Sequence, residues 1–210
     1  MTCTDSKAWY NCYSGSYDLI CDSSMVHPAK MSPALCYRIF AHLKELNLID
    51  DNSVILDPLA GTGMTGLIAA SLGMKAILVE LEPKFIDLIK LNIAHLEGTL
   101  GYELDITVIQ GDSRNLSSLL QERGLCTVTS PPYLDSDNRG NSFNNRANPE
   151  LKRQKWDDWE KGYSDNPANI GNLKDRPLKA VMTELEQLDS AYELVKADPE
   201  YKFGVYIREG

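Results

Sequence analysis

The stretch Thr129-Ser130-Pro131-Pro132-Tyr133 combines a hydroxyl, two consecutive prolines and an aromatic ring. A proline has no backbone N–H, so two of them end a β-ladder and leave carbonyls that can accept hydrogen bonds from a ligand. The Ser130 hydroxyl and the Pro131 carbonyl could bind the hydrogens of a planar amine and favour a localised lone pair on its nitrogen. Tyr133 could stack on a base that has left its duplex, as base-modifying enzymes require. A rigid turn with a packed tyrosine is the simpler alternative.

A second stretch, Asp57-Pro58-Leu59-Ala60-Gly61-Thr62-Gly63, is typical of a ligand-binding loop. Gly61 and Gly63 permit a tight turn and a close approach of the backbone to a ligand, although an ordinary strand-to-helix turn also explains them. A phosphate-binding loop would need Gly-Lys-Ser/Thr, and here Met64 follows Gly63. A dinucleotide site would need G-x-G-x-x-G, a spacing that Gly61, Gly63 and Gly66 satisfy, but the rest of the chain argues against such a site.

Two acidic residues lie where a nucleoside could use them. Glu80 ends the apolar run that follows the glycine loop, and a carboxylate at that position can accept hydrogen bonds from ribose hydroxyls. Asp112 follows Gly111 after the next apolar run, where it could meet an adenine amino group. Ligands of open parallel sheets bind beyond the carboxyl ends of the strands, and both acids are predicted to lie there.

These residues are connected by alternating strands and helices. Ser32-Pro33 is a helix-start signal, an N-cap hydroxyl followed by a proline, and predicts a helix to about Asn47. Apolar runs predict strands at 54–56, at 75 to 79 or 80, at 105–109 and at 126–129, and helical spacing predicts helices at 65–72, 83–96 and 117–122. This alternation indicates an α/β fold with a mostly parallel sheet and helices on both faces.

The sequence after Tyr133 is organised differently. Residues 134–178 are polar and form an unusually long connection, and such connections usually bind ligands or are disordered. An amphipathic helix is predicted over Ala180–Val195 and one short strand over Phe203–Ile207. We therefore expect a cofactor-binding and catalytic core at 1–133, a polar insertion at 134–178, and a C-terminal helix and short strand at 179–210.

Taken together, the motifs resemble those of the S-adenosylmethionine-dependent DNA amino-methyltransferases, which modify cytosine N4 or adenine N6. The family pattern D-P-x-x-G-x-G followed by [D/N/S]-P-P-[Y/F/W] is matched by Asp57–Gly63 and Ser130–Tyr133. His27-Pro28-Ala29-Lys30 resembles the family's H-P-A-K element, which lies next to the methionine part of the cofactor. The resemblance covers His27 to Tyr133 and implies a Rossmann-like methyltransferase fold.

The resemblance also implies roles for individual residues. Asp57, Gly61 and Gly63 would hold the methionine end of S-adenosylmethionine, Glu80 its ribose and Asp112 its adenine. The full set implied for the cofactor is His27, Pro28, Lys30, Asp57, Pro58, Gly61, Thr62, Gly63, Glu80 and Asp112. The catalytic set is Ser130, Pro131, Pro132 and Tyr133, acting by direct in-line transfer to a flipped base. The serine in this loop favours cytosine N4 over adenine N6.

Other methyl-transfer chemistries fit less well. Carbon-5 cytosine methylation uses a nucleophilic cysteine, which in that family follows a proline, and none of the five cysteines does. The family continues after its catalytic loop with several strands and a turn of the L-K-P-G-G type, whereas here we find one candidate strand and no such turn. A split or catalytically silent cofactor-binding subunit, or an RNA amino-methyltransferase, are therefore the alternatives to a DNA enzyme.

Composition and charge limit the partners. The 210 residues carry a net charge of −9, which does not favour nucleic-acid binding over the whole surface. The segment 139–156 is locally basic, with Glu150 as its one acid, so duplex DNA is expected to bind there. A second chain or a homodimer could complete the sheet.

The scattered cysteines predict neither a disulfide framework nor a metal site. No apolar run predicts a membrane span or a secretion signal, so we expect a cytoplasmic protein of a prokaryote, an archaeon or a phage.

Overall fold

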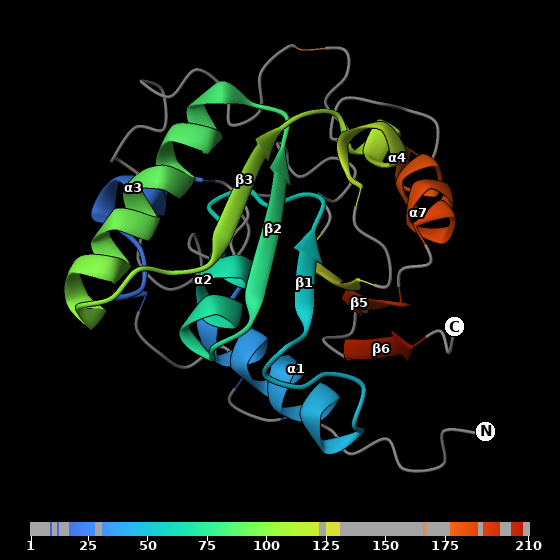
Figure 1. Ribbon diagram of the computed structural model, residues 1–210, viewed down its shortest axis with the longest axis horizontal. Coiled ribbons are helices and arrows are strands. Elements are labelled where there is room, and N and C mark those ends of the chain that lie inside the picture. Colours follow the sequence, from blue (N-terminus) through green and yellow to red (C-terminus); the bar gives the residue numbers. More distant parts are fainter. Residues whose placement is uncertain are drawn as a thin grey trace, which may run out of the picture.

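The computed structural model describes Trp9, Cys12, residues 17–27, 31–121 and 125–130, Asn166, and residues 177–188, 191–197 and 203–207. Its centre is a six-stranded sheet with the strand order β3-β2-β1-β4-β5-β6 (Figure 1). The strands are β1 (Val54–Asp57), β2 (Lys75–Glu80), β3 (Ile106–Gln110), β4 (Cys126–Thr129), β5 (Ala191–Ala197) and β6 (Phe203–Ile207). All neighbouring strands pair in parallel except β5 and β6, which are antiparallel.

Helices connect the strands. They are α1 (Pro33–Glu45), α2 (Met64–Ser71), α3 (Pro83–Leu100), α4 (Leu116–Leu119) and α7 (Pro177–Gln187), with the short 3-10 helices η1 (Asp22–Val26) and η2 (Ser113–Asn115). The mostly parallel sheet with helices on both faces confirms the predicted fold class. Its order, in which β1 lies between β2 and β4, is that of a Rossmann-like fold.

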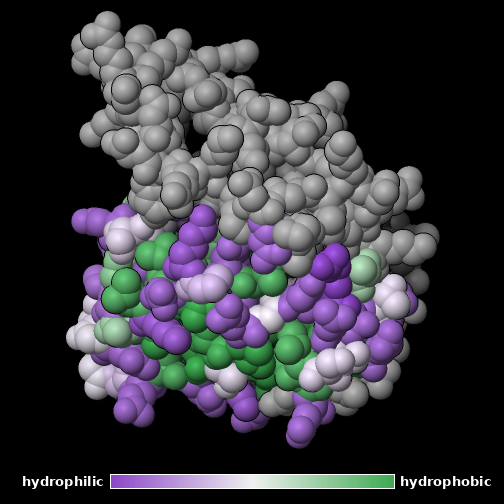
Figure 2. Space-filling model, turned by 90° about the horizontal axis from the view of Figure 1, so that it is seen from above, coloured by the Kyte–Doolittle hydropathy of each residue, from purple (hydrophilic) through white to green (hydrophobic). Residues whose placement is uncertain are grey.

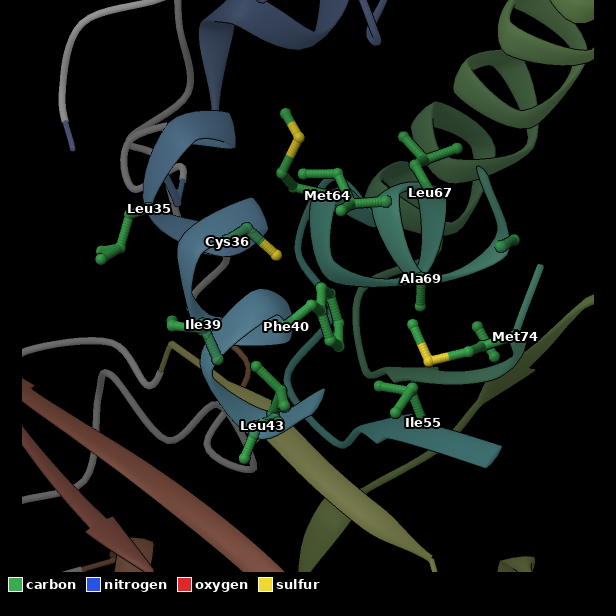
Figure 3. Packing of buried hydrophobic residues seen from close by; sticks show 14 of the residues in the cluster. Leu35, Cys36, Ile39, Phe40, Leu43, Ile55, Met64, Leu67, Ala69 and Met74 are labelled. Atoms are coloured by element: carbon green, nitrogen blue, oxygen red, sulfur yellow. The ribbon is translucent and has the colours of Figure 1, made fainter. Parts of the chain in front are cut away.

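One face of the sheet is covered by α1, α2 and α3. Figure 3 shows Cys36 and Phe40 of α1 pointing toward α2. Leu43 of α1, Met64 of α2 and Ile55 of β1 belong to the same buried cluster. Leu78 of β2 packs with Ile89 of α3 on this same face. The opposite face is covered by α4 and α7, whose buried residues pack on β1 and β2.

One predicted helix cap and one predicted helix end differ from the structure. The helix α1 begins at Pro33 as predicted, but the Ser32 hydroxyl does not cap it and instead donates a hydrogen bond of 2.6 Å to the Cys12 carbonyl. The helix α3 continues to Leu100, past the predicted end, and stops where Gly101 takes a left-handed φ of 78°. A glycine adopts this conformation at little cost, so it is a natural helix end.

The prediction of one helix over Ala180–Val195 was wrong. The helix α7 ends at Gln187, and residues 191–197 form β5, which pairs in parallel with β4. Val181, Leu185 and Leu188 have helical spacing and are buried, whereas a short apolar run further on suits a strand as well as a helix. Backbone hydrogen bonds with β4 make residues 191–197 a strand. Among the described residues, two strands therefore follow the predicted catalytic loop, where the sequence predicted one.

Candidate cofactor and catalytic site

The predicted site residues at the ends of β1, β2, β3 and β4 lie at one edge of the sheet. Strands β1, β2, β3 and β4 run in parallel, so their carboxyl ends meet at this edge. Figure 2 looks toward it from above, and hydrophobic residues gather in the middle of the described part of this face, with hydrophilic residues on either side. The topology thus brings Asp57, Glu80, Asp112 and Ser130 to one side of the molecule, as the sequence predicted.

The loop after β1 is a tight turn held by its own backbone. The Gly63 N–H donates to the Ala60 carbonyl over 2.7 Å, and the Ala60 N–H donates to the Val79 carbonyl of β2 over 3.1 Å. Gly61 and Gly63 have φ angles of 55° and 82°, in the left-handed region that side chains disfavour. The two glycines are therefore required by the turn.

Asp57 lies beneath this loop. Its carboxylate is buried and accepts a hydrogen bond of 3.1 Å from the Leu59 N–H. Burial raises the pKa of Asp57, and the hydroxyls of Thr129 and Thr65 lower it in part. The Thr129 hydroxyl is buried, and it makes no hydrogen bond of ordinary geometry within the described residues. Asp57 thus stabilises the start of the glycine loop through its hydrogen bond to the Leu59 N–H.

Glu80 connects β2 to the loop. One carboxylate oxygen accepts a hydrogen bond of 2.8 Å from the Gly61 N–H, and the other accepts one of 2.9 Å from the Glu82 N–H. Burial raises the pKa of Glu80 from 4.5 to about 7, although backbone N–H groups, that of Glu82 foremost, lower it in part. A buried carboxylate with spare lone pairs at a strand end can accept hydrogen bonds from ligand hydroxyls.

Asp112 is engaged by a neighbour. Its carboxylate caps η2 by accepting from the Arg114 N–H over 2.9 Å, and it also pairs with the Arg114 guanidinium. The hydrogen bond from Arg114 holds the pKa of Asp112 below its usual value. In this structure Asp112 is an ionised, paired carboxylate, and its contact with adenine stays a prediction. The next residue, Ser113, donates a hydrogen bond to the Pro58 carbonyl and so joins this loop to the first.

His27 packs directly against the glycine loop. It is buried, and its ring meets that of Phe85 edge-on with centroids 4.4 Å apart. A Cβ atom on Gly61 would lie 3.1 Å from Nε2 of His27, so the ring covers the glycine closely. The predicted neighbours Pro28 and Lys30 lie outside the described residues.

The predicted catalytic loop is described only at its first residue. Ser130 directly follows β4 and is exposed at the site edge of the sheet. Pro131, Pro132 and Tyr133 lie outside the described residues, so their roles stay predictions. Exposure of Ser130 leaves its hydroxyl accessible to a ligand.

Sequence analysis missed one polar residue at the site. Asn92 of α3 is wholly buried and donates a hydrogen bond of 2.9 Å to the carbonyl of Thr62 in the glycine loop. It lies in line with the buried Ile89 and Leu96 on the inner face of the helix. The sequence signal for Asn92 is a polar residue at an apolar position of an amphipathic helix. A buried amide needs hydrogen-bond partners, so such a residue indicates a specific contact.

A family model described as DNA methylase matches residues 5–91. The match includes His27, the loop Asp57–Gly63 and Glu80, and it confirms the resemblance over this part of the chain. Asp112 and Ser130 lie beyond it. The part of the sequence that carries most of the predicted cofactor residues is therefore similar to DNA methylases.

Several solved structures are similar in part. A Pyrococcus horikoshii protein provisionally named as an RNA methyltransferase is 21% identical, with 53% of each chain covered and a TM-score of 0.41. A human methyltransferase 10 domain-containing protein is 13% identical over 80% of this chain and 66% of its own, with a TM-score of 0.47. The glycopeptide N-methyltransferase MtfA, complexed with sinefungin, is 17% identical over 51% of this chain and 41% of its own, with a TM-score of 0.37. The chain spans about half the length of the first of these proteins.

The described residues offer neither a metal cluster nor a membrane span. Among them no group of three or more His, Cys, Asp or Glu side chains is placed to hold a metal ion. No helix in the described ranges is both long and apolar enough to cross a membrane. Cys12, Cys21, Cys36 and Cys126 form no disulfide bond with one another.

Proposed function

We propose that this chain binds S-adenosylmethionine and transfers its methyl group to an exocyclic base amine in DNA, with cytosine N4 favoured over adenine N6. The observation that carries the proposal is the hydrogen bond between Glu80 and the Gly61 N–H. This hydrogen bond joins the acid at the end of β2 to the glycine loop after β1. Both lie at the edge of the sheet where Ser130 follows β4. The match to DNA methylases over residues 5–91 supports the same conclusion.

The residues of the loops fit the proposed cofactor. Glu80 has a carboxylate at the site edge whose lone pairs suit ribose hydroxyls, and the left-handed Gly61 and Gly63 leave the backbone open to close approach. Asp112 is held in one orientation by Arg114 and would accept from the adenine amine. His27, Pro28 and Lys30, with Pro58, Thr62 and Asp57, complete the proposed set around the methionine end.

When bound, S-adenosylmethionine supplies an electrophilic methyl group on a positively charged sulfur. The amine of cytosine or adenine is a poor nucleophile, because its lone pair is delocalised into the ring. Ser130 and the Pro131 carbonyl accept its two hydrogens and turn the lone pair toward the methyl group. In such a transfer the nitrogen–carbon bond would form as the sulfur–carbon bond breaks, S-adenosylhomocysteine would leave, and the methylated amine would lose one proton to water. Tyr133 stacks on the flipped base, and Pro132 stiffens the loop.

Duplex DNA is the proposed partner, and it would contact the locally basic part of residues 134–178. We assign the core to residues 1–133 and the C-terminal unit to 179–210, and the latter contains most of α7 together with β5 and β6. A second chain or a homodimer is proposed to complete the binding surface. The proposed setting is the cytoplasm of a prokaryote or archaeon, or a phage-infected cell.

The test is methyl transfer from tritium-labelled S-adenosylmethionine to mixed-sequence duplex DNA, followed by digestion and identification of the labelled base. Label on cytosine N4 or adenine N6 is expected for the wild-type chain. Ser130→Ala and Tyr133→Ala are each expected to lower it by at least about 100-fold, in the range typical of lost transition-state interactions. Ser118→Ala and Tyr102→Ala remove the same groups from exposed positions of the described surface and should retain activity.

Parallel reactions separate the alternatives. Label on RNA and none on DNA would make the chain an RNA amino-methyltransferase. Bound cofactor, measured by calorimetry, without label on either nucleic acid would indicate a silent or split subunit. No cofactor binding at all would overturn the proposal.

A further inference from the structure

The side-chain amide of Asn92 connects three separate parts of the molecule. Its Oδ1 atom accepts hydrogen bonds from the Cys21 N–H over 2.9 Å and from the Ser24 hydroxyl over 2.8 Å. Its Nδ2 atom donates to the Thr62 carbonyl over 2.9 Å. Asn92 itself belongs to α3, so one buried side chain joins α3, the η1 segment and the glycine loop.

The orientation of this amide is dictated by its partners. The Cys21 N–H can only donate and the Thr62 carbonyl can only accept, so the oxygen of Asn92 must face η1 and its NH2 group must face the loop. Neither an apolar residue nor an ionised acid satisfies both sides. The change Asn92→Asp would place an acceptor against the Thr62 carbonyl. The change Asn92→Ala would leave polar groups on both sides without this partner, which is costly in a buried place.

The contacts continue from Asn92 to His27 and return to the loop. Ser24 is wholly buried, and its carbonyl accepts a hydrogen bond of 3.2 Å from the His27 N–H at the end of η1. The His27 ring then covers Gly61, and Thr62 follows Gly61 in the chain. Asn92, Ser24, His27, Gly61 and Thr62 therefore form a closed ring of contacts.

We infer that Asn92 is a positioning residue for the cofactor site, which fixes the His27 segment and the glycine loop relative to each other. The inference rests on the proposed function. Binding is tighter when the groups that contact a ligand are already held in the bound arrangement, because less ordering has to occur on binding. A buried polar network whose members all have partners provides this rigidity. Asn92 acts through the backbone of residues 61–63 and through His27, without touching the cofactor itself.

The inference is tested by calorimetric titration of the full chain with S-adenosylhomocysteine, at a temperature where every variant is folded. Asn92→Ala and Asn92→Asp are expected to raise the Kd at least about tenfold. The alanine removes the hydrogen bonds on both sides of the amide, and the aspartate sets an acceptor against the Thr62 carbonyl on the loop side. Ser24→Ala removes one bond of the ring and is expected to raise the Kd about threefold, in line with one neutral hydrogen bond. In the transfer assay Asn92→Asp should raise the KM for S-adenosylmethionine more than it lowers kcat.

Leu43→Ala is the matched control, because it opens the same side of the core in α1 without touching the ring. It should lower the melting temperature and leave the Kd within about twofold of the wild type, because the ring of contacts stays intact. A wild-type Kd retained in Asn92→Asp and Ser24→Ala would overturn the inference, even if Asn92→Ala does not fold. Absence of binding by the wild-type chain would instead overturn the proposed function.

Discussion

Among single residues, Glu80 has an unusual environment for a carboxylate. It is buried at the end of β2, where the backbone N–H groups of Gly61 and Glu82 donate to it. Burial raises the pKa of Glu80 to about 7, so the group is partly protonated near neutral pH. A ligand with hydroxyl groups could add further donors and favour the ionised form.

Because its pKa in the folded chain exceeds the ordinary 4.5, Glu80 holds a proton between pH 4.5 and about 7 that the unfolded chain has released. Its contribution to stability is therefore complete below pH 4.5 and is lost as the pH rises through about 7. We expect the free energy of unfolding to fall by an amount on the order of 3 kcal/mol from this group alone across that window.

Urea unfolding of the wild type and of Glu80→Gln at pH values on both sides of neutrality checks this expectation. The glutamine variant should have a flatter profile, because it has no proton to release. Glu103→Gln, which changes an exposed acid, is the control for the change of net charge. Parallel profiles for the wild type and Glu80→Gln would show that Glu80 does not titrate in this range.

Among the secondary-structure elements, α4 and α7 are joined by hydrogen bonds. One carboxylate oxygen of Glu184 in α7 accepts from the Ser117 N–H over 2.8 Å and from the Ser117 hydroxyl over 2.6 Å. The first N–H groups of a helix lack partners within the helix, and here a distant side chain supplies one. Together with Val181 and Leu185, this contact attaches α7 to the sheet face formed by β1 and β2.

Glu184→Ala is expected to lower the free energy of unfolding by about 1–2 kcal/mol, because it removes the acceptor of two hydrogen bonds from a partly buried helix start. The measurement is urea unfolding followed by circular dichroism. Gln187→Ala, a change at an exposed position of the same helix, should alter stability by less than about 0.5 kcal/mol. Equal stabilities of the two variants would mean that the contact does not hold α7 in place.

At the scale of the whole molecule, the sheet extends into the C-terminal residues. β5 pairs in parallel with β4 along Cys126–Thr129, and β6 closes the sheet in the antiparallel direction (Figure 1). The strand that leads into the catalytic loop is therefore internal to the sheet. Without β5, β4 would be an edge strand with unpaired backbone groups, and exposed edges of this kind promote aggregation.

Deletion of residues 191–210 is therefore expected to lower the melting temperature by more than about 5 °C and to promote aggregation. Thermal unfolding and light scattering measure the two effects. Deletion of residues 208–210 alone retains both strands and is the control. A truncated chain that has the melting temperature of the wild type and stays monodisperse would show that β5 and β6 do not stabilise β4.

Some features were predictable because neighbouring residues dictate them. Pro33 begins α1, and the glycines of the loop after β1 take left-handed angles. Asp57 and Glu80 end their strands. A hydrophobic period, a proline or a glycine acts within a few residues, so each of these features is encoded locally. The parallel sheet and its site edge follow from this alternation. Asp57, Glu80, Asp112 and Ser130 were located in this way.

Other features were decided only by contacts between distant residues. Residues 191–197 are a strand because β4 offers them backbone partners, which no local pattern records. The burial of Asn92 between η1 and the glycine loop, and the attachment of Glu184 to α4, likewise depend on segments that are far apart in the chain. Local sequence specifies which conformations a segment can adopt, and the tertiary structure chooses among them by satisfying buried polar groups and strand edges that only the folded chain brings together.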